Sequence, residues 1–189
     1  MSLFARSDYS DDELFQQTLR GDAGAYGRLY DRYVSQLYRY VYYRVGNKEE
    51  AEDLTETVFL KTWEAIKNGR VKQGDFRAWL YRAAHNQVID YYRTHKQNAS
   101  LDETMDVNDP APHPEAIVQD RQKHEKLMEA MSKLDPELQQ IITCRFINDM
   151  DHSEISKIMG IREGYLRVLQ YRALKKLSQL LGHDQGADL

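Results

Sequence analysis

The sequence predicts an all-α protein made of two helical domains joined by a flexible acidic linker. Apolar residues recur every three or four positions over long segments, which is the spacing of one helix face. Ten glycines and four prolines in 189 residues, with few β-branched runs, argue against an all-β fold. Between residues 98 and 120 there is no Lys or Arg, and that stretch holds the following acids and prolines: Asp102, Glu103, Asp106, Asp109, Glu115, Asp120, Pro110, Pro112 and Pro114. Such a segment cannot form a core, so we expect domains at 1–97 and 121–189 that do not share one.

In the first domain, helices are predicted over residues 11–19, 22–45, 48–66 and 76–94. Ser10 or Asp11 is a suitable N-cap for the first helix, and Asn47 and Asp75 for the last two. Gly46 ends the long second helix. The buried stripe of the fourth helix is expected at Phe76, Trp79, Leu80, Ala83, Ala84, Val88 and Tyr91.

In the second domain, helices are predicted over residues 115–133, 136–147, 152–159 and 162–181. Asp135 followed by Pro136 is typical of a helix start, and Asp151 caps the next helix. Gly160 permits a left-handed turn between the last two helices, which gives the spacing of a helix-turn-helix. Side chains near the start of the second helix of this motif reach base edges, and later cations meet phosphates. The alternative is a basic helix that is only solvated.

Two more surfaces carry concentrated chemistry. Five acids lie within eight residues at the start of the third helix (Glu49, Glu50, Glu52, Asp53 and Glu56), followed by Phe59, Leu60 and Trp63. Acids in a first turn complement the helix dipole, but this number beside apolar residues indicates a docking face for a basic partner. The fourth helix mixes cations with aromatic residues, a pattern that suits unpaired bases, but Trp79 and Tyr91 lie on its apolar face and are expected in the core.

In order along the chain, these segments resemble an extracytoplasmic-function (ECF) sigma factor of bacterial RNA polymerase. Residues 49–63 (EEAEDLTETVFLKTW) resemble the polymerase-binding helix of sigma domain 2. Residues 76–93 (FRAWLYRAAHNQVIDYYR) are similar to the helix behind promoter melting and −10 recognition. Residues 134–146 (LDPELQQIITCRF) and 154–177 (EISKIMGIREGYLRVLQYRALKKL) resemble sigma domain 4 with its −35-reading helix-turn-helix.

The resemblance implies roles for particular residues and partners. Docking on the clamp coiled coil of the largest core subunit falls to Glu49, Glu52, Asp53, Leu54, Glu56 and Phe59. Contacts with the −10 element fall to Arg70, Lys72, Arg77, Asn86 and Arg93. Contacts with the −35 element fall to Arg162, Tyr165, Arg167, Val168, Tyr171, Arg172, Lys175 and Lys176. The resemblance also implies contact with the flap region of polymerase, an anti-sigma factor as partner, and a monomer when free.

The recognition helix departs from the family pattern. Where the family usually has Gly-Thr-Val, this chain has Gly164-Tyr165-Leu166. Val168 stands where a small polar residue is common, and Ser156 replaces a usual alanine. These differences leave the fold unaffected and bear on the preferred −35 sequence.

Composition and motifs argue against several other classes of protein. No apolar run approaches the length of a membrane span, no signal peptide is visible, and a single Cys144 excludes an internal disulfide, so we expect a cytoplasmic protein. The resemblance implies that this cytoplasm is bacterial. No motif of a metalloprotease, phosphate-binding loop or serine hydrolase occurs, so we expect neither an enzyme nor a cofactor.

Two rival functions remain at this point. The first is a stand-alone helix-turn-helix regulator, which binds an operator tightly without polymerase. The second is a helical adaptor that binds only proteins. The net charge of −4 and pI of about 5.9 disfavour tight duplex binding by the chain alone.

Overall fold

The computed structural model describes residues 9–71, 74–98 and 115–182, and this part of the chain is helical throughout its regular structure. The first domain contains α1 (Asp11–Leu19), α2 (Ala23–Val45), α3 (Lys48–Lys67) and α4 (Phe76–Asn98). The second contains α5 (Glu115–Ser132), α6 (Pro136–Ile142), the π-helical turn η1 (Thr143–Ile147), α7 (His152–Met159) and α8 (Glu163–Leu180). The all-α prediction is confirmed. Residues 99–114 of the predicted linker lie outside the described residues, and its last residues begin α5.

The helix starts follow local capping chemistry. Ser10 and Glu13 form a reciprocal capping box at α1, and Asp151 and Glu154 form another at α7. Asn47 accepts a hydrogen bond from the amide of Glu50 at 3.0 Å, which fixes the start of α3. These caps were predicted from the sequence. At α6 the predicted cap differs, because the side chain of Asp135 makes no capping bond and pairs instead with Lys176 of α8.

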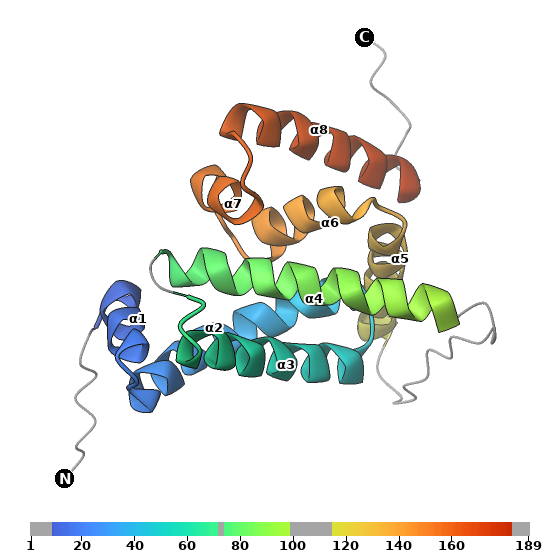
Figure 1. The fold of residues 1–189 in the computed structure, drawn as a ribbon. Helices are drawn as coiled ribbons and strands as arrows, with labels where there is room; N and C mark the ends of the chain where they lie inside the picture. Colours follow the sequence, from blue (N-terminus) through green and yellow to red (C-terminus); the bar gives the residue numbers. More distant parts are fainter. Residues whose placement is uncertain (1–8, 72–73, 99–114, 183–189) are drawn as a thin grey trace.

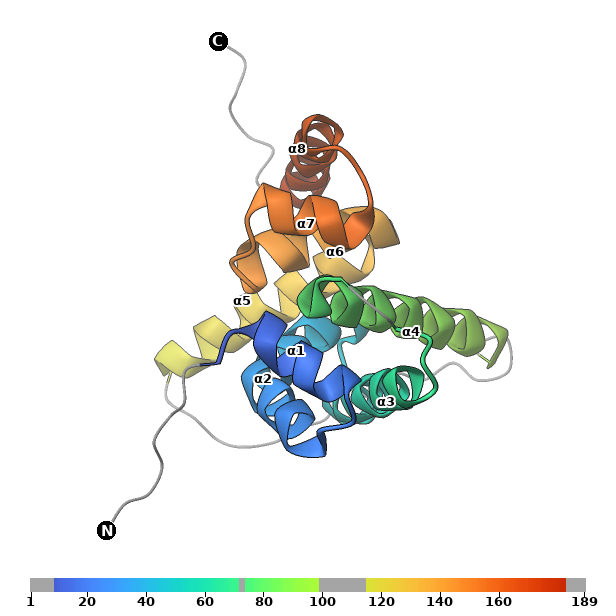
Figure 2. The ribbon, with the colours of Figure 1, turned by 60° about the vertical axis from the view of Figure 1, so that its left-hand side comes forward.

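The two predicted domains pack on one another. Figure 1 shows α4 lying between α2 and α3 on one side and α6 and α7 on the other, with α8 outermost; Figure 2 shows the same order from another side. The core that contains Leu29, Tyr40 and Leu80 also contains Cys144 and Ile155 of the second domain. The expectation that the domains share no core is therefore wrong. The physical reason is that α4 is apolar on two faces, since Ala78 and Tyr81 are buried in addition to four residues of the predicted stripe, Phe76, Leu80, Ala84 and Val88. The other three stripe residues, Trp79, Ala83 and Tyr91, are partly buried.

The second domain also has a small core of its own. It consists of Ala130, Met131, Leu134, Ile142, Ala173 and Leu177, which join α5, α6 and α8. This cluster holds α8 against α6 by its inner face. The outer face of α8 consequently stays in solvent, as its sequence pattern predicts.

Candidate nucleic-acid interface

The turn between α7 and α8 has the geometry of a helix-turn-helix. Gly160 adopts φ 68°, in the left-handed region, and its amide bonds to the carbonyl of Ser156 at 2.8 Å. The Ser156 hydroxyl donates to the carbonyl of Ile161, which closes the turn. Ser156 therefore serves this turn with its side chain, a role that an alanine could not supply. Leu166 and Leu169 are buried and fix the inner face of α8.

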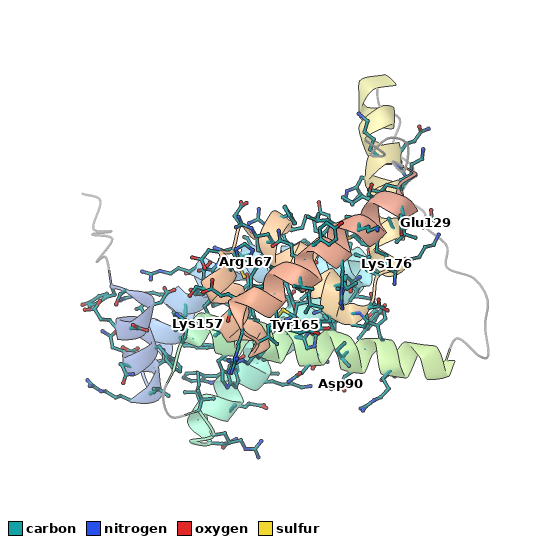
Figure 3. The ribbon with its side chains drawn as sticks, turned by 90° about the horizontal axis from the view of Figure 1, so that it is seen from above. Asp90, Glu129, Lys157, Tyr165, Arg167 and Lys176 are labelled. Atoms are coloured by element: carbon teal, nitrogen blue, oxygen red, sulfur yellow. The ribbon has the colours of Figure 1, made fainter. Side chains whose placement is uncertain are left out.

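The outer face of α8 presents the residues predicted to meet duplex DNA (Figure 3). Tyr165, Val168 and Tyr171 are 49%, 46% and 68% exposed, and Arg162, Arg167, Arg172 and Lys175 are exposed beside them. Arg167 has a carboxylate partner within its own helix, Glu163, at 3.6 Å. Among the described residues no carboxylate pairs with Arg162, Arg172 or Lys175. The face thus combines available cations with three apolar side chains.

Lys176 stands apart from the other predicted −35 residues. It is partly buried and its Nζ lies 2.9 Å from Asp135 Oδ2 at the start of α6. The Lys176 hydrogen bond, and then its charge, lower the pKa of Asp135 below its usual value. Lys176 therefore fastens α8 to α6 in this arrangement.

The residues predicted for the −10 element are spread along α4 and the loop before it. Asp75 caps α4 by accepting from the amide of Ala78 at 3.0 Å. Arg70 and Asn86 are exposed, and Arg93 is exposed with Asp90 at 3.2 Å. Arg77 and Arg93 are about 24 Å apart along the helix, so they cannot share one small site. Lys72 lies outside the described residues.

Arg77 and its neighbour Arg82 face the second domain. Arg77 forms an ion pair with Glu154 of α7. Arg82 donates from Nε to the carbonyl of Ile158 at 3.0 Å and from Nη2 to the carbonyl of Lys157. Both arginines therefore bind groups of one short helix. The resemblance implied a DNA contact for Arg77, and nothing in the sequence indicated this internal partner.

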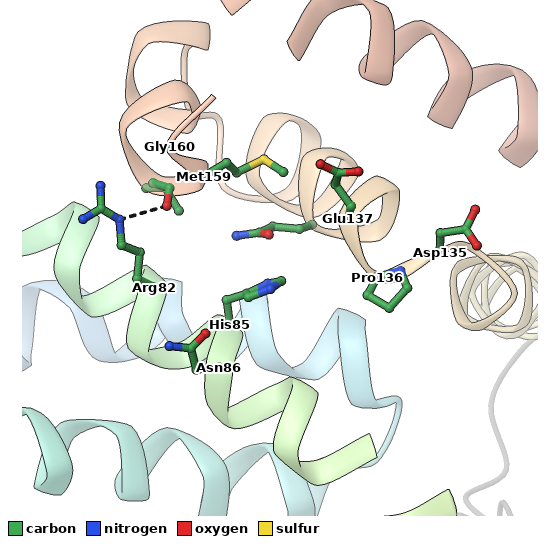
Figure 4. A pocket seen from close by; sticks show the side chains of 10 residues that line it. Arg82, His85, Asn86, Asp135, Pro136, Glu137, Met159 and Gly160 are labelled. Carbon is green, nitrogen blue, oxygen red and sulfur yellow. Dashed lines mark hydrogen bonds between the residues drawn. The ribbon is translucent and has the colours of Figure 1, made fainter. Parts of the chain in front are cut away.

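A cleft lies next to these contacts, between α4 and the α6–α7 segment. Figure 4 shows Arg82, His85 and Asn86 on one wall and Pro136, Glu137 and Met159 on the other. Its volume is about 590 Å³. Its charges are mixed, since Asp135 and Glu137 stand opposite Arg82.

A buried cation sits behind His85. Arg44 is 1% exposed; its Nη1 donates to the Tyr40 hydroxyl and lies 3.1 Å from His85 Nδ1, while its Nη2 has no partner. No carboxylate contacts it within the described part of the chain. Burial, and then the charge of Arg44, lower the pKa of His85 to about 4. Neutral His85 can accept the hydrogen bond at Nδ1.

The acidic face of α3 borders a groove of about 530 Å³ between α2 and α3. Glu49, Glu52, Asp53 and Glu56 are exposed, as predicted. Leu54 and Phe59 are 8% and 3% exposed, so they belong to the core and not to the surface that the resemblance implied. Of the apolar residues that the sequence analysis placed beside the acids, Leu60 is exposed. The groove adds residues that the sequence analysis did not select, namely Tyr30, Val34 and Tyr38 of α2.

Phe59 is buried because α2 covers it. The Tyr30 ring packs edge-on against Phe59 with centroids 4.7 Å apart, and the Tyr26 hydroxyl donates to the Phe59 carbonyl at 2.6 Å. The i, i+4 spacing of Thr55 and Phe59 puts both on the inner face of α3, where Thr55 is also buried. Phe59 and Leu60 are neighbours in the sequence but lie on different sides of α3, so Phe59 is buried and Leu60 is exposed. The position of Phe59 next to the acids did not reveal this difference.

Profiles of two protein families match the chain. "Sigma-70 region 2" matches residues 29–98, and "Sigma-70, region 4" matches residues 124–177. The first covers most of α2, all of α3 and all of α4, and the second covers the second half of α5 together with α6 and the helix-turn-helix. The matches define a protein with both regions of the sigma-70 class.

Curated relatives give a finer assignment. The ECF RNA polymerase sigma factor BldN of Streptomyces coelicolor is 37% identical over 91% of this chain and 66% of that protein. SigE of Mycolicibacterium smegmatis is 28% identical over 85% of this chain and 64% of that protein. SigW of Bacillus subtilis is 25% identical over 88% of this chain and 94% of that protein. The chain belongs to the ECF sigma factor family, and it spans slightly less than two thirds of the length of BldN and SigE.

Solved structures agree on the fold. CnrH in complex with the cytosolic domain of CnrY matches with a TM-score of 0.70 at 22% identity, covering 93% of this chain and all of that one. The sigma factor RpoE in complex with the anti-sigma factor NepR from Bartonella quintana matches with a TM-score of 0.62 at 16% identity, covering 84% and 98%. No helix within the described residues is long and apolar enough to cross a membrane.

Proposed function

We propose that this chain is a promoter-specificity subunit: it binds core RNA polymerase and directs initiation at promoters by recognising −10 and −35 elements. The observation that carries the proposal is the exposed outer face of α8, with exposed cations beside Tyr165, Val168 and Tyr171, in a chain with both sigma-70 regions. Sigma factors perform no catalysis themselves. The work of the chain is therefore recognition, in the bacterial cytoplasm.

The acidic face of α3 is the proposed contact with core polymerase. Exposed carboxylates at Glu49, Glu52, Asp53 and Glu56 suit a basic surface such as the clamp coiled coil of the largest subunit. The groove lined by Tyr30, Val34 and Tyr38 adds apolar area beside the acids. Aromatic groups surrounded by charge are typical of the energetic centre of an interface.

The two DNA contacts divide between the domains. We assign the −10 element to residues 1–97, through Arg70, Lys72, Arg77, Asn86 and Arg93. We assign the −35 element to residues 121–189, through α8, with Arg167 and Arg172 toward bases and Lys175 toward phosphate. Residues 98–120 join them, and the flap region of polymerase is the proposed second anchor of the α8 domain.

An anti-sigma factor is the further proposed partner. The RpoE structure from Bartonella quintana contains one, and its fold matches this chain. We propose that the chain is a monomer when free of these partners. We therefore expect an anti-sigma factor that binds this chain to compete with core polymerase for it.

Reconstitution with core polymerase tests the proposal. The full-length chain, mixed with core enzyme and a library of genomic promoter fragments, should yield transcripts from a set of promoters that share two elements. A matched chain with Arg167→Ala and Arg172→Ala should lose most of them. Absence of promoter-specific transcripts, together with protection of a duplex site by the chain alone, would establish the stand-alone regulator instead. Full promoter activity in the double variant would favour the adaptor.

A further inference from the structure

The face of α4 that carries Arg77 and Arg82 is an interaction surface already in use within the chain. Its ligands there are the Glu154 carboxylate and the carbonyls of Lys157 and Ile158, all from α7. A carboxylate and the negative C-terminal end of a helix are the electrostatic counterparts of a phosphate backbone. α7 therefore offers these arginines what a nucleic acid would offer.

We propose that α7 acts as an internal substitute for DNA on α4, so that the free chain is held closed and the melted −10 strand must displace α7. The proposal rests on the proposed function only in taking DNA as the competing ligand. Closure itself rests on the contacts between the domains. Either Arg77 pairs with Glu154 or it is free for a phosphate, because one guanidinium face cannot serve both.

Uncharged contacts hold the same closed arrangement. Asn148, 7% exposed, donates from Nδ2 to the carbonyl of Gln36 on α2 at 2.8 Å and to the Tyr81 hydroxyl on α4 at 2.9 Å. The Gln139 amide of α6 donates to the carbonyl of Arg44 at 3.4 Å. These bonds join the domains without using any residue assigned to DNA.

The closed arrangement also contains a feature that opposes it. Gln139 of the second domain helps to cover Arg44, a cation with no carboxylate beside it in the described structure and with an unpartnered Nη2. Burying an unpaired charge costs free energy, and opening would return water to it. The latch consists of one partly buried ion pair and the hydrogen bonds of Arg82 to two carbonyls, so a ligand that competes for the two arginines can release it.

Two variants of the full-length chain test the proposal. Glu154→Gln removes the carboxylate that faces Arg77, and its amide oxygen can still accept from the amide of Asp151, so the capping box at α7 is kept. Asn148→Ala loosens the interface without changing charge. Glu129→Gln is the matched control, because Glu129 is exposed and pairs at 2.6 Å with Lys133 inside α5.

The measurement is binding of a fluorescent 12-nucleotide single-stranded DNA of mixed sequence to each free protein, without polymerase. Glu154→Gln and Asn148→Ala should each bind about two- to fivefold more tightly than the wild type, and Glu129→Gln should not. Small-angle X-ray scattering should show a larger radius of gyration for both. High salt should reduce the difference between wild type and Glu154→Gln.

Equal tightening by Glu154→Gln and Glu129→Gln reflects net charge and overturns the proposal. Unchanged DNA binding in either Glu154→Gln or Asn148→Ala also overturns it. The reconstitution assay separates the two hypotheses: promoter-specific transcripts with no effect of these variants reject closure alone. Tighter binding by both variants without such transcripts keeps closure and rejects the polymerase role.

Discussion

The two helices proposed to face promoter DNA are in opposite situations. On α4, Arg77 and Arg82 bind groups of α7, and Tyr81 between them is fully buried. On α8, Tyr165, Val168 and Tyr171 stand in solvent. Both helices look alike in sequence, since each mixes cations with aromatic residues.

The difference shows that the neighbouring helices determine which face of a basic, aromatic helix is free to bind a partner. α4 lies between two layers of helices and uses two faces for packing, whereas α8 packs against α5, α6 and α7 by its inner face within the described part of the chain (Figure 1). The outer face of α8 is ready to bind, and the α7-facing side of α4 becomes available only when the domains separate. The variants below break or sharpen this contrast.

The largest effect is expected from a matched pair of tyrosines. Tyr81→Ala removes a ring that is 0% exposed, packs edge-on against Tyr40 at 5.1 Å and accepts from Asn148. It should lower the free energy of unfolding by about 3–5 kcal/mol, measured by urea denaturation. Tyr171→Ala, at a position 68% exposed, should change it by less than about 0.5 kcal/mol.

In a transcription assay, the exposed tyrosine should matter although it contributes little to stability. Tyr171→Ala should reduce initiation at −35-dependent promoters while leaving the urea midpoint in place. Similar losses of stability in the two variants would mean that the outer face of α8 is packed in solution, and the contrast between the helices would fail.

The next effect concerns cations within α8. Arg167→Ala should weaken promoter use by about 1–3 kcal/mol if Arg167 makes a bidentate base contact. Its partner Glu163 is exposed and releases it at little cost. Lys176→Ala should affect promoter use less, because Lys176 already pairs with Asp135. Competition binding of reconstituted polymerase to wild-type and −35-substituted promoters measures the loss of binding free energy in each variant. An equal loss in Arg167→Ala and Lys176→Ala would contradict the proposed difference between the two cations.

Much of the fold could be predicted from the sequence. Caps at Asn47, Asp75 and Asp151 and the left-handed Gly160 depend on a few adjacent residues, so local chemistry specifies them. The π-helical turn at residues 143–147 was not predicted, and the sequence analysis continued a helix through it. In that turn the Asn148 amide bonds back to the carbonyl of Thr143 at 3.1 Å, while the Asn148 side chain reaches Gln36 and Tyr81 of the other domain. Because the residue that closes this turn also binds the other domain, adjacent residues alone do not predict the turn.

The candidate sites were predictable where exposure follows helix phase alone. The acids of α3 and the outer face of α8 fall in this group. Phe59 does not, because its burial depends on the Tyr30 ring that α2 places against it. Arg77 does not, because its partner Glu154 is 77 residues away. The acidic segment at residues 98–120 differs in charge from its flanks, but charge in a connecting segment does not determine whether the domains it connects touch.

A smaller effect is expected on the acidic face of α3, which lies away from the contact between the domains. Asp53→Asn and Glu56→Gln should each weaken core-polymerase binding by about 0.5–1 kcal/mol, because exposed charges contribute modestly and are screened. Titration of labelled core enzyme at two salt concentrations measures this. Glu64→Gln, an exposed acid near the other end of the same helix, is the control. An equal loss in the control would assign the effect to net charge and leave α3 without a specific docking face.

The smallest expected effect is a pH dependence of stability that comes from His85 on α4. In the folded chain the pKa of His85 is lowered from about 6.5 to about 4 by burial and then by Arg44. Between these values the unfolded chain binds a proton that the folded chain does not, so this histidine makes stability fall as the pH drops from about 6.5 to 4. His85→Gln keeps a polar side chain beside Arg44 and removes that titration. The urea midpoint of the wild type should therefore fall more steeply than that of His85→Gln across this range, whereas above pH 7 the two slopes should match. Parallel slopes across the whole range would show that His85 is hydrated in solution, and hence that the α4 side is as open as the outer face of α8.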